Sequence, residues 1–174
     1  INERFSFVSD LVSMIADKSI PSVVITGEGG LGKTYVVMKT IKEAGLEDTR
    51  SFLSNLEKNE DDEDSPFLMQ GDYSVVKGFS TAKGLYRTLY ENRNKIVIFD
   101  DCDSILKDPV ALNLLKGALD SYDERWLSWN AEASFGDSLP RSFKFVGQII
   151  FISNIPMMKV DQAIRSRSMC VDLA

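Results

Sequence analysis

The sequence has 174 residues, of which 44% are hydrophobic and 26% charged, values typical of one globular domain with a substantial core. Its net charge of −6 gives no overall attraction to nucleic acid or to an anionic membrane, although a local basic patch is compatible with it. Because the chain has no histidine, histidine bases, histidine triads and histidine metal sites are excluded.

The cysteines and the apolar runs bear on the compartment. Cys102 and Cys170 lie far apart and match no metal-binding or redox spacing. The sequence contains neither an apolar run long enough to span a bilayer nor a signal-peptide pattern at its start. We therefore expect a cytoplasmic protein in a reducing environment, with no membrane partner.

The first predicted elements are a helix, a strand and a glycine-rich loop. Apolar residues recur at helical spacing between Phe5 and Ile15, and Pro21 follows this helix. The apolar run 23–26 predicts a short buried strand. The segment after it fits the pattern G-x-x-x-x-G-K-[ST] and consists of Gly27, Glu28, Gly29, Gly30, Leu31, Gly32, Lys33 and Thr34.

This segment has the chemistry of a phosphate-binding loop. Glycines allow a tight turn whose N–H groups point at anionic oxygens, and the helix predicted after it adds the positive end of its dipole. Lys33 can reach the β- and γ-phosphates, and Thr34 can offer a hydroxyl to Mg²⁺. An ordinary glycine-rich turn is the alternative, and the flanking strand and helix count against it.

An acidic stretch and a second strand come next. Residues 57–64 contain six acids, and we interpret 57–66 as a solvated loop, with a bait for basic partners as the alternative. The run 73–79 predicts a strand, and Ser80 or Thr81 can cap the helix that follows.

The run 95–101 predicts a central parallel strand, since residues 96–99 are continuously apolar and lead into Asp100 and Asp101. Asp108 followed by Pro109 predicts the start of another helix.

The remaining third of the chain is less regular. The insertion 121–147 predicts a short hairpin or a long loop, and 148–153 predicts a buried strand that ends at Asn154. A short helix over 161–165 and a last strand over 169–173 complete the pattern. Strands that alternate with helices imply an α/β fold with a parallel sheet and right-handed crossovers.

Polar residues at the strand ends suit phosphate chemistry. Asp100 is placed to hold Mg²⁺, and Asp101 to polarise an attacking water, unless both merely end a strand. Asn154 can orient a water or contact a γ-phosphate, or it is a turn residue. Arg165 and Arg167 can stabilise a transferring phosphoryl group, although two arginines near a chain end are unremarkable alone.

The ordered set GEGGLGKT, IVIFDD, IIFISN and AIRSRS resembles the AAA+ ATPase family over nearly the whole chain. In this comparison Gly27 to Thr34 correspond to the Walker A motif, and Asp100 and Asp101 to the Walker B acids. Asn154 corresponds to sensor 1. Arg167 matches the arginine finger best, and Arg165 is a second candidate.

The resemblance implies a P-loop NTPase three-layer sandwich with a five-stranded parallel sheet in the order 5-1-4-3-2. It also implies that residues 1–174 are the large subdomain of an AAA+ core that binds ATP and Mg²⁺ and hydrolyses ATP. Such cores assemble into homo-oligomeric rings, often hexamers, with the active site between subunits and Arg167 acting in trans.

The sequence departs from the family pattern in two places. Asp101 stands where the family usually has glutamate, one methylene longer, which bears on the rate of hydrolysis. The chain ends at Ala174, where family members continue into a helical lid. We therefore expect the large subdomain of a longer protein, with weakened nucleotide affinity and ring formation by itself.

Members of the family act on polymers, and two segments of the sequence are relevant to whether that polymer is a protein or a nucleic acid. The turn 77–79 loosely resembles an aromatic pore loop of protein-threading members, with Phe79 packed in the core as the alternative. The insertion could stack bases and meet phosphates, or fold over itself, through Arg125, Trp126, Trp129, Arg141 and Lys144. The sequence does not choose between protein and nucleic acid.

Two other classes of protein share part of this pattern. STAND-type signalling switches also use GGxGKT and an apolar strand that ends in Asp-Asp, and they bind nucleotide with little turnover. Asn154, where those proteins usually have arginine, and the late Ser-Arg pair favour the ATPase class. A non-enzymatic scaffold that retains a nucleotide is a third option.

Overall fold

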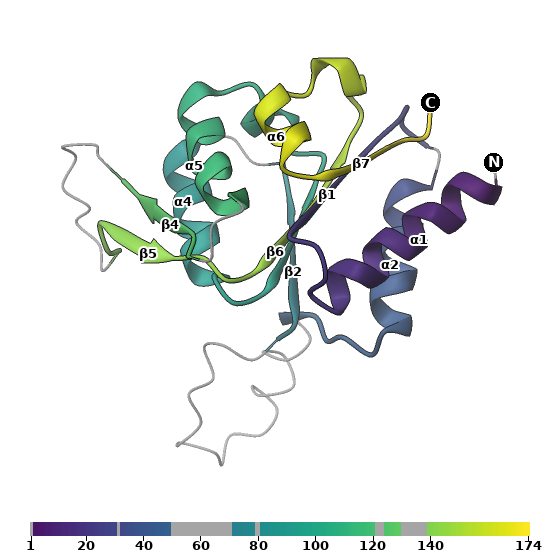
Figure 1. Cartoon of the computed structure of the whole chain (residues 1–174), viewed down its shortest axis with the longest axis horizontal. Helices are drawn as coiled ribbons and strands as arrows, with labels where there is room; N and C mark the ends of the chain where they lie inside the picture. The colour runs from purple at the N-terminus through teal and green to yellow at the C-terminus, as the bar shows by residue number, and fades with distance from the viewer. Residues whose placement is uncertain (1, 31, 50–70, 79–80, 121–123, 130–138) are drawn as a thin grey trace, which may run out of the picture.

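The computed structural model describes residues 2–30, 32–49, 71–78, 81–120, 124–129 and 139–174. A parallel sheet lies between two layers of helices (Figure 1). The strands are β1 (Ser22–Thr26), β2 (Tyr73–Lys77), β3 (Ile96–Asp100), β4 (Trp126–Ser128), β5 (Ser142–Lys144), β6 (Gln148–Ser153) and β7 (Met169–Asp172). The helices are α1 (Asn2–Ala16), α2 (Lys33–Glu43), α4 (Ala82–Glu91), α5 (Pro109–Leu119) and α6 (Gln162–Ser166), with 3₁₀ turns η2 (Asp103–Leu106) and η3 (Met157–Lys159).

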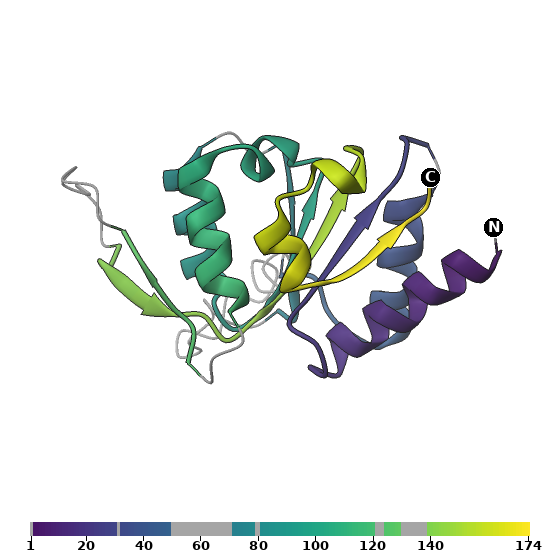
Figure 2. The same ribbon diagram turned by 45° about the horizontal axis from the view of Figure 1, so that its top comes forward.

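The main sheet has five strands in the order β2-β3-β6-β1-β7, and every neighbouring pair is parallel (Figure 2). The predicted α/β fold with a five-stranded parallel sheet is confirmed. Because the strands are parallel, their carboxyl ends all lie at the same edge of the sheet. The predicted Asp100 and Asn154 therefore come to the edge at which the glycine-rich loop follows β1.

The central strands are buried on both faces, which explains their continuous apolar sequences. Val23 and Ile25 of β1 face the layer formed by α1 and α2. Val24 between them faces the other core, which contains α4, α5 and α6. This alternation fixes the register of the sheet, because a shift by one residue would exchange the two cores.

Side-chain caps set the starts of α4 and α5. The Asp108 carboxylate accepts from the N–H groups of Val110 and Ala111 at 2.8 and 3.1 Å, with Pro109 at the first helical position of α5. The Thr81 hydroxyl accepts from Gly84 N at 3.1 Å. The helix starts predicted at residues 81 and 108–109 are therefore confirmed.

The described part of the insertion forms a hairpin. This is the first of the two predicted alternatives, a short hairpin or a long loop. β4 and β5 pair antiparallel, with Leu127 opposite Phe143, and both side chains are buried. Tyr86 of α4 contacts the hairpin, with ring centroids 5.1 Å from Phe143 and 5.6 Å from Trp129. The hairpin thus extends the core on the α4–α5 side of the sheet.

Some predictions lie outside the described residues. These are the acidic loop 57–66, the pore-loop residue Phe79, the phosphate-loop residue Leu31 and the tip of the insertion at 130–138. Within the described residues, no helix combines the length and the apolar composition that crossing a bilayer requires.

Candidate functional site

A cavity of about 440 Å³ opens at the carboxyl edge of the sheet. The glycine-rich loop, the start of α2, and the ends of β2, β3 and β6 surround it. The residues that line it are Gly29, Gly30, Gly32, Lys33, Thr34, Lys77, Asp100, Asp101, Ile152 and Asn154. The sheet therefore brings together the predicted phosphate loop, both predicted acids and the predicted asparagine.

The backbone of the loop favours glycine at three positions, the first of which, Gly27, has a φ of 149°. Gly30 and Gly32 have φ values of 80° and 83°, in the left-handed region that favours glycine. A Cβ atom built at either position would meet no atom of the described residues within 4 Å, so conformation rather than crowding selects glycine there. Gly32 is also the N-cap of α2, which leaves the first N–H groups of the helix open to an anion.

Lys33 is the best-satisfied cation in the cavity. The residue is only 6% exposed, and its Nζ donates to the carbonyls of Gly27 and Glu28, each at 2.7 Å, and to Asn154 Oδ1 at 3.0 Å. Burial lowers the pKa of Lys33, and the negative charges of Asp100 and Asp103 oppose that shift. All three ammonium N–H groups therefore stabilise the loop and join it to the end of β6.

Thr34 and Asp100 are joined by a hydrogen bond at one carboxylate oxygen of Asp100. Thr34 Oγ1 donates to Asp100 Oδ2 at 3.1 Å, and Asp100 is only 8% exposed. Lys77 Nζ lies 3.8 Å from the same oxygen. A hydroxyl and a carboxylate in this arrangement fit Mg²⁺, which takes one or two protein ligands and completes its shell with water and phosphate oxygens.

The described residues offer no cluster of three or more acidic, cysteine or histidine side chains that could hold a metal by themselves. This agrees with the ligand set at Asp100, because a magnesium site of the phosphate-loop kind does not need a cage made only of protein atoms. The residues present therefore fit a metal that enters together with a phosphate.

Asp101 differs from its neighbour in conformation and exposure. Its φ of 58° is left-handed, which is uncommon for a residue other than glycine, and its N–H donates to Ile152 O at 3.1 Å. The residue is exposed and lines the cavity, whereas Asp100 is buried. The sharp turn of the backbone thus places two consecutive carboxylates in two different environments.

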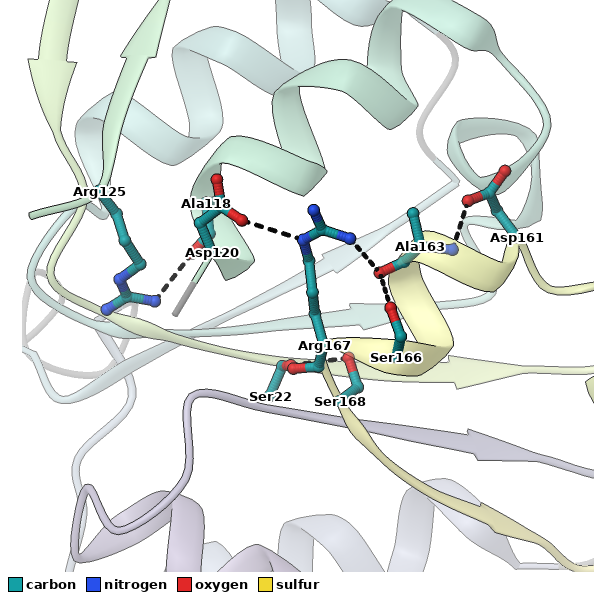
Figure 3. Close-up of polar contacts among 9 residues, drawn as sticks. All are labelled: Ser22, Ala118, Asp120, Arg125, Asp161, Ala163, Ser166, Arg167 and Ser168. Carbon is teal, nitrogen blue, oxygen red and sulfur yellow. Dashed lines mark hydrogen bonds and ion pairs between the residues drawn. The ribbon is translucent and has the colours of Figure 1, made fainter. Parts of the chain in front are cut away.

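The two arginines do not line the cavity. Arg167 Nε donates to Asp120 Oδ1 at 3.1 Å, and its Nη1 donates to Ala163 O at 3.0 Å (Figure 3). Its own carbonyl accepts from Ser22 Oγ at 3.1 Å, at the end of β1 opposite the glycine-rich loop. Arg165 Nε donates to Val160 O at 3.0 Å. Within one chain, neither arginine is part of the site.

Only some of the hairpin residues proposed to contact a polymer are engaged inside the fold. Arg125 donates to Ala118 O (Figure 3). It also donates to Gly147 O, and burial lowers the pKa of its guanidinium. Lys144 lies 3.6 Å from a Glu124 carboxylate oxygen. Trp126 is 56% exposed and Arg141 is exposed. The structure therefore supports the folded-over alternative for Arg125, whereas Trp126 and Arg141 are exposed.

Two polar contacts near the cavity were not predicted. Lys77 pairs with Asp100, and the Ser153 hydroxyl donates to Asp103 Oδ1 at 2.6 Å, which ties η2 to the end of β6. The first contact follows from strand register, because Lys77 and Asp100 are partners in the β2–β3 ladder. No sequence signal revealed it, because the predicted strand extended to residue 79 and its end does not align Lys77 with Asp100.

No family model matches the sequence. Over 187 aligned residues the chain is 30% identical to a protein of Enterobacteria phage T4 named "Uncharacterized 36.7 kDa protein in nrdC-mobD intergenic region". The alignment covers 99% of this chain and 51% of the phage protein. The chain therefore spans about half the length of the curated relative that it matches, and the name of that relative states no activity.

Proposed function

We propose that the chain binds Mg-ATP in this cavity and hydrolyses it, as the large subdomain of an AAA+ ATPase core. The observation that carries the proposal is the 3.1 Å contact between Thr34 Oγ1 and Asp100 Oδ2. These residues lie 66 positions apart, on segments that follow β1 and end β3, and β6 separates those strands in the sheet. A metal-binding hydroxyl and carboxylate thus converge beside a phosphate-binding loop.

The topology supports the same class of fold. When the five strands of the main sheet are numbered in chain order and read from β7, their order is 5-1-4-3-2, the order that the AAA+ resemblance implies. Helices on both faces of this sheet agree with a three-layer P-loop NTPase. Topology alone assigns no reaction, so the function depends on the residues of the site.

Each residue of the cavity has a role in this proposal. Lys33 exchanges its contacts with the Gly27 and Glu28 carbonyls for phosphate oxygens, and the open N–H groups at the start of α2 add further donors. Thr34 and Asp100 hold Mg²⁺, which supplies positive charge at the phosphate oxygens when bound. Asp101, exposed on the cavity wall, orients and deprotonates the attacking water.

Asn154 and the arginines complete the proposed machinery. Asn154 accepts a hydrogen bond from Lys33, so phosphate binding by Lys33 would change this hydrogen bond. Because Arg167 is held at the opposite end of β1, it can only act on the site of a neighbouring subunit. The proposal therefore includes a homo-oligomeric ring, with protein or nucleic acid as the polymer on which it acts.

The test of the proposal is a titration of fluorescent ATP in Mg²⁺ against the wild type and Thr34→Val, with Thr88→Val on α4 as the matched control. We expect Thr34→Val to weaken binding by about tenfold or more, since a magnesium ligand is lost, and Thr88→Val to bind as the wild type does. Equal affinity of all three proteins contradicts the site.

Release of inorganic phosphate from saturating ATP then separates the two nucleotide-binding classes. Steady turnover that Asp101→Asn abolishes supports the ATPase. Tight binding without turnover in the assembled, full-length protein indicates a switch of the STAND type.

A further inference from the structure

The end of β2 places a second lysine at the cavity. Lys77 is the last residue of β2 and the ladder partner of Asp100 on β3. Its Nζ lies 3.8 Å from Asp100 Oδ2, the oxygen that also accepts from Thr34. The Lys77 side chain is 69% exposed, whereas the Asp100 side chain is 12% exposed.

The two lysines of the cavity are held in different ways. Lys33 uses its three N–H groups on two backbone carbonyls and one amide oxygen. Lys77 pairs with Asp100 alone among the described acidic side chains, through a contact that is too long for a strong hydrogen bond. This contact is long and its lysine is mostly exposed, and such pairs contribute little to stability, so Lys77 can leave Asp100 readily.

A divalent cation and the Lys77 ammonium compete for the same carboxylate oxygen. Both are positive, so a cation bound at Asp100 Oδ2 repels the ammonium from a site 3.8 Å away. Without the cation, Lys77 offsets the negative charge of Asp100, which would otherwise repel the phosphates of an incoming nucleotide.

We propose that Lys77 acts as a replaceable counter-ion of Asp100, which neutralises this carboxylate when no metal is bound and so sets how strongly nucleotide binding depends on Mg²⁺. This inference rests on the proposed function, because it assumes that ATP and Mg²⁺ occupy the cavity. In this role Lys77 is a positioning and affinity-determining residue, not a catalytic one.

The experiment compares the dissociation constants of fluorescent ATP in excess EDTA and in Mg²⁺ for the wild type, Lys77→Met and Lys77→Arg. Lys159→Met, which removes an exposed lysine outside the cavity, controls for the change in net charge. A magnesium titration at fixed nucleotide gives the metal concentration at half-maximal binding. Thermal unfolding shows whether each variant keeps its fold.

We expect Lys77→Met to raise the dissociation constant in EDTA by roughly tenfold, because Asp100 is left uncompensated near the phosphates. In Mg²⁺ the affinity stays within about twofold of wild type, and half-maximal binding needs roughly threefold less metal, because a competitor is gone. Lys77→Arg and Lys159→Met keep the wild-type ratio between the two conditions.

A loss of affinity that is equal in EDTA and in Mg²⁺, or an unchanged ratio, overturns the inference and leaves the nucleotide site intact. Absence of ATP binding by the wild type in Mg²⁺ overturns the proposed function and this inference with it. The two failures are therefore distinguishable in one set of titrations.

Discussion

The side chain of Lys33 donates a hydrogen bond to Asn154 Oδ1 over 3.0 Å, although the two residues lie 121 positions apart. One belongs to the start of α2 and the other follows β6. This contact joins the glycine-rich loop to a central strand. A change in the partners of Lys33 would therefore change the hydrogen bonding at the end of β6.

Asn154→Ala should lower the free energy of unfolding by about 0.5–1.5 kcal/mol, because the Lys33 ammonium loses one of its three acceptors at a position that water can reach. Urea denaturation at neutral pH measures the change. Asn113→Ala, which removes an exposed amide from α5, is the control and should be neutral. If both variants unfold at the same urea concentration as wild type, the contact does not contribute to the free energy of unfolding.

Arg167→Ala should abolish ATP turnover in the full-length assembly and leave ATP binding intact, since its guanidinium lies away from the cavity of its own chain. Mixing Arg167→Ala subunits with Asp101→Asn subunits should restore partial turnover, because some interfaces then combine an intact Arg167 with an intact Asp101. Phosphate release by each protein alone and by the mixture is the measurement. No recovery in any mixture argues against a shared site.

The buried Lys95 should make stability depend on alkaline pH. It is 3% exposed, its Nζ donates to Thr49 Oγ1 at 3.2 Å, and burial lowers its pKa below the usual 10.5. Between the lowered value and 10.5 the unfolded chain binds more protons than the folded one, so this lysine makes the unfolding free energy rise with pH.

Lys95→Met removes that rise. The unfolding free energy of the variant minus that of wild type should therefore be largest near neutral pH and decrease as the pH approaches 10.5. Urea denaturation of both proteins across this range gives the difference, in which the opposing effects of Tyr73 and Tyr86, whose pKa values burial raises, cancel. A difference that stays constant with pH contradicts the assignment.

Gly147→Ala should destabilise the fold by about 1–3 kcal/mol or more, because a Cβ there would lie 2.1 Å from the backbone oxygen of Lys95. Gly29→Ala is the control for stability, since its Cβ would meet no described atom within 4 Å. Thermal unfolding of both variants checks the prediction. Equal melting temperatures would mean that the approach of Gly147 to β3 relaxes without penalty.

The central strands could be predicted from the sequence because burial on both faces gives each a continuous apolar run, as in residues 149–152. The predicted end of β2 was less accurate. The predicted strand reached Phe79, but pairing stops at Lys77, before Gly78 with its left-handed φ of 65°. The 3₁₀ turns η2 and η3 were not predicted, because such short turns leave no periodic pattern.

The candidate site also contains residues that could be predicted from the sequence and contacts that could not. Thr34 and Asp100 were predicted as partners because each belongs to a motif whose strand context fixes its position. The Lys77–Asp100 pair depends on register between two strands, which no local pattern shows. Arg125 was proposed to face a polymer, yet it binds carbonyls of Ala118 and Gly147, which only the folded hairpin brings within reach.

The most direct test of the account is a calorimetric titration of Mg-ATP into the wild type and Lys33→Ala, with Lys159→Ala as the control for loss of an exposed lysine. We predict saturable binding by the wild type and by Lys159→Ala, and at least about tenfold weaker binding by Lys33→Ala, whose phosphate contact is gone. Equal affinity of Lys33→Ala and wild type, or no binding by any of the three, would contradict it.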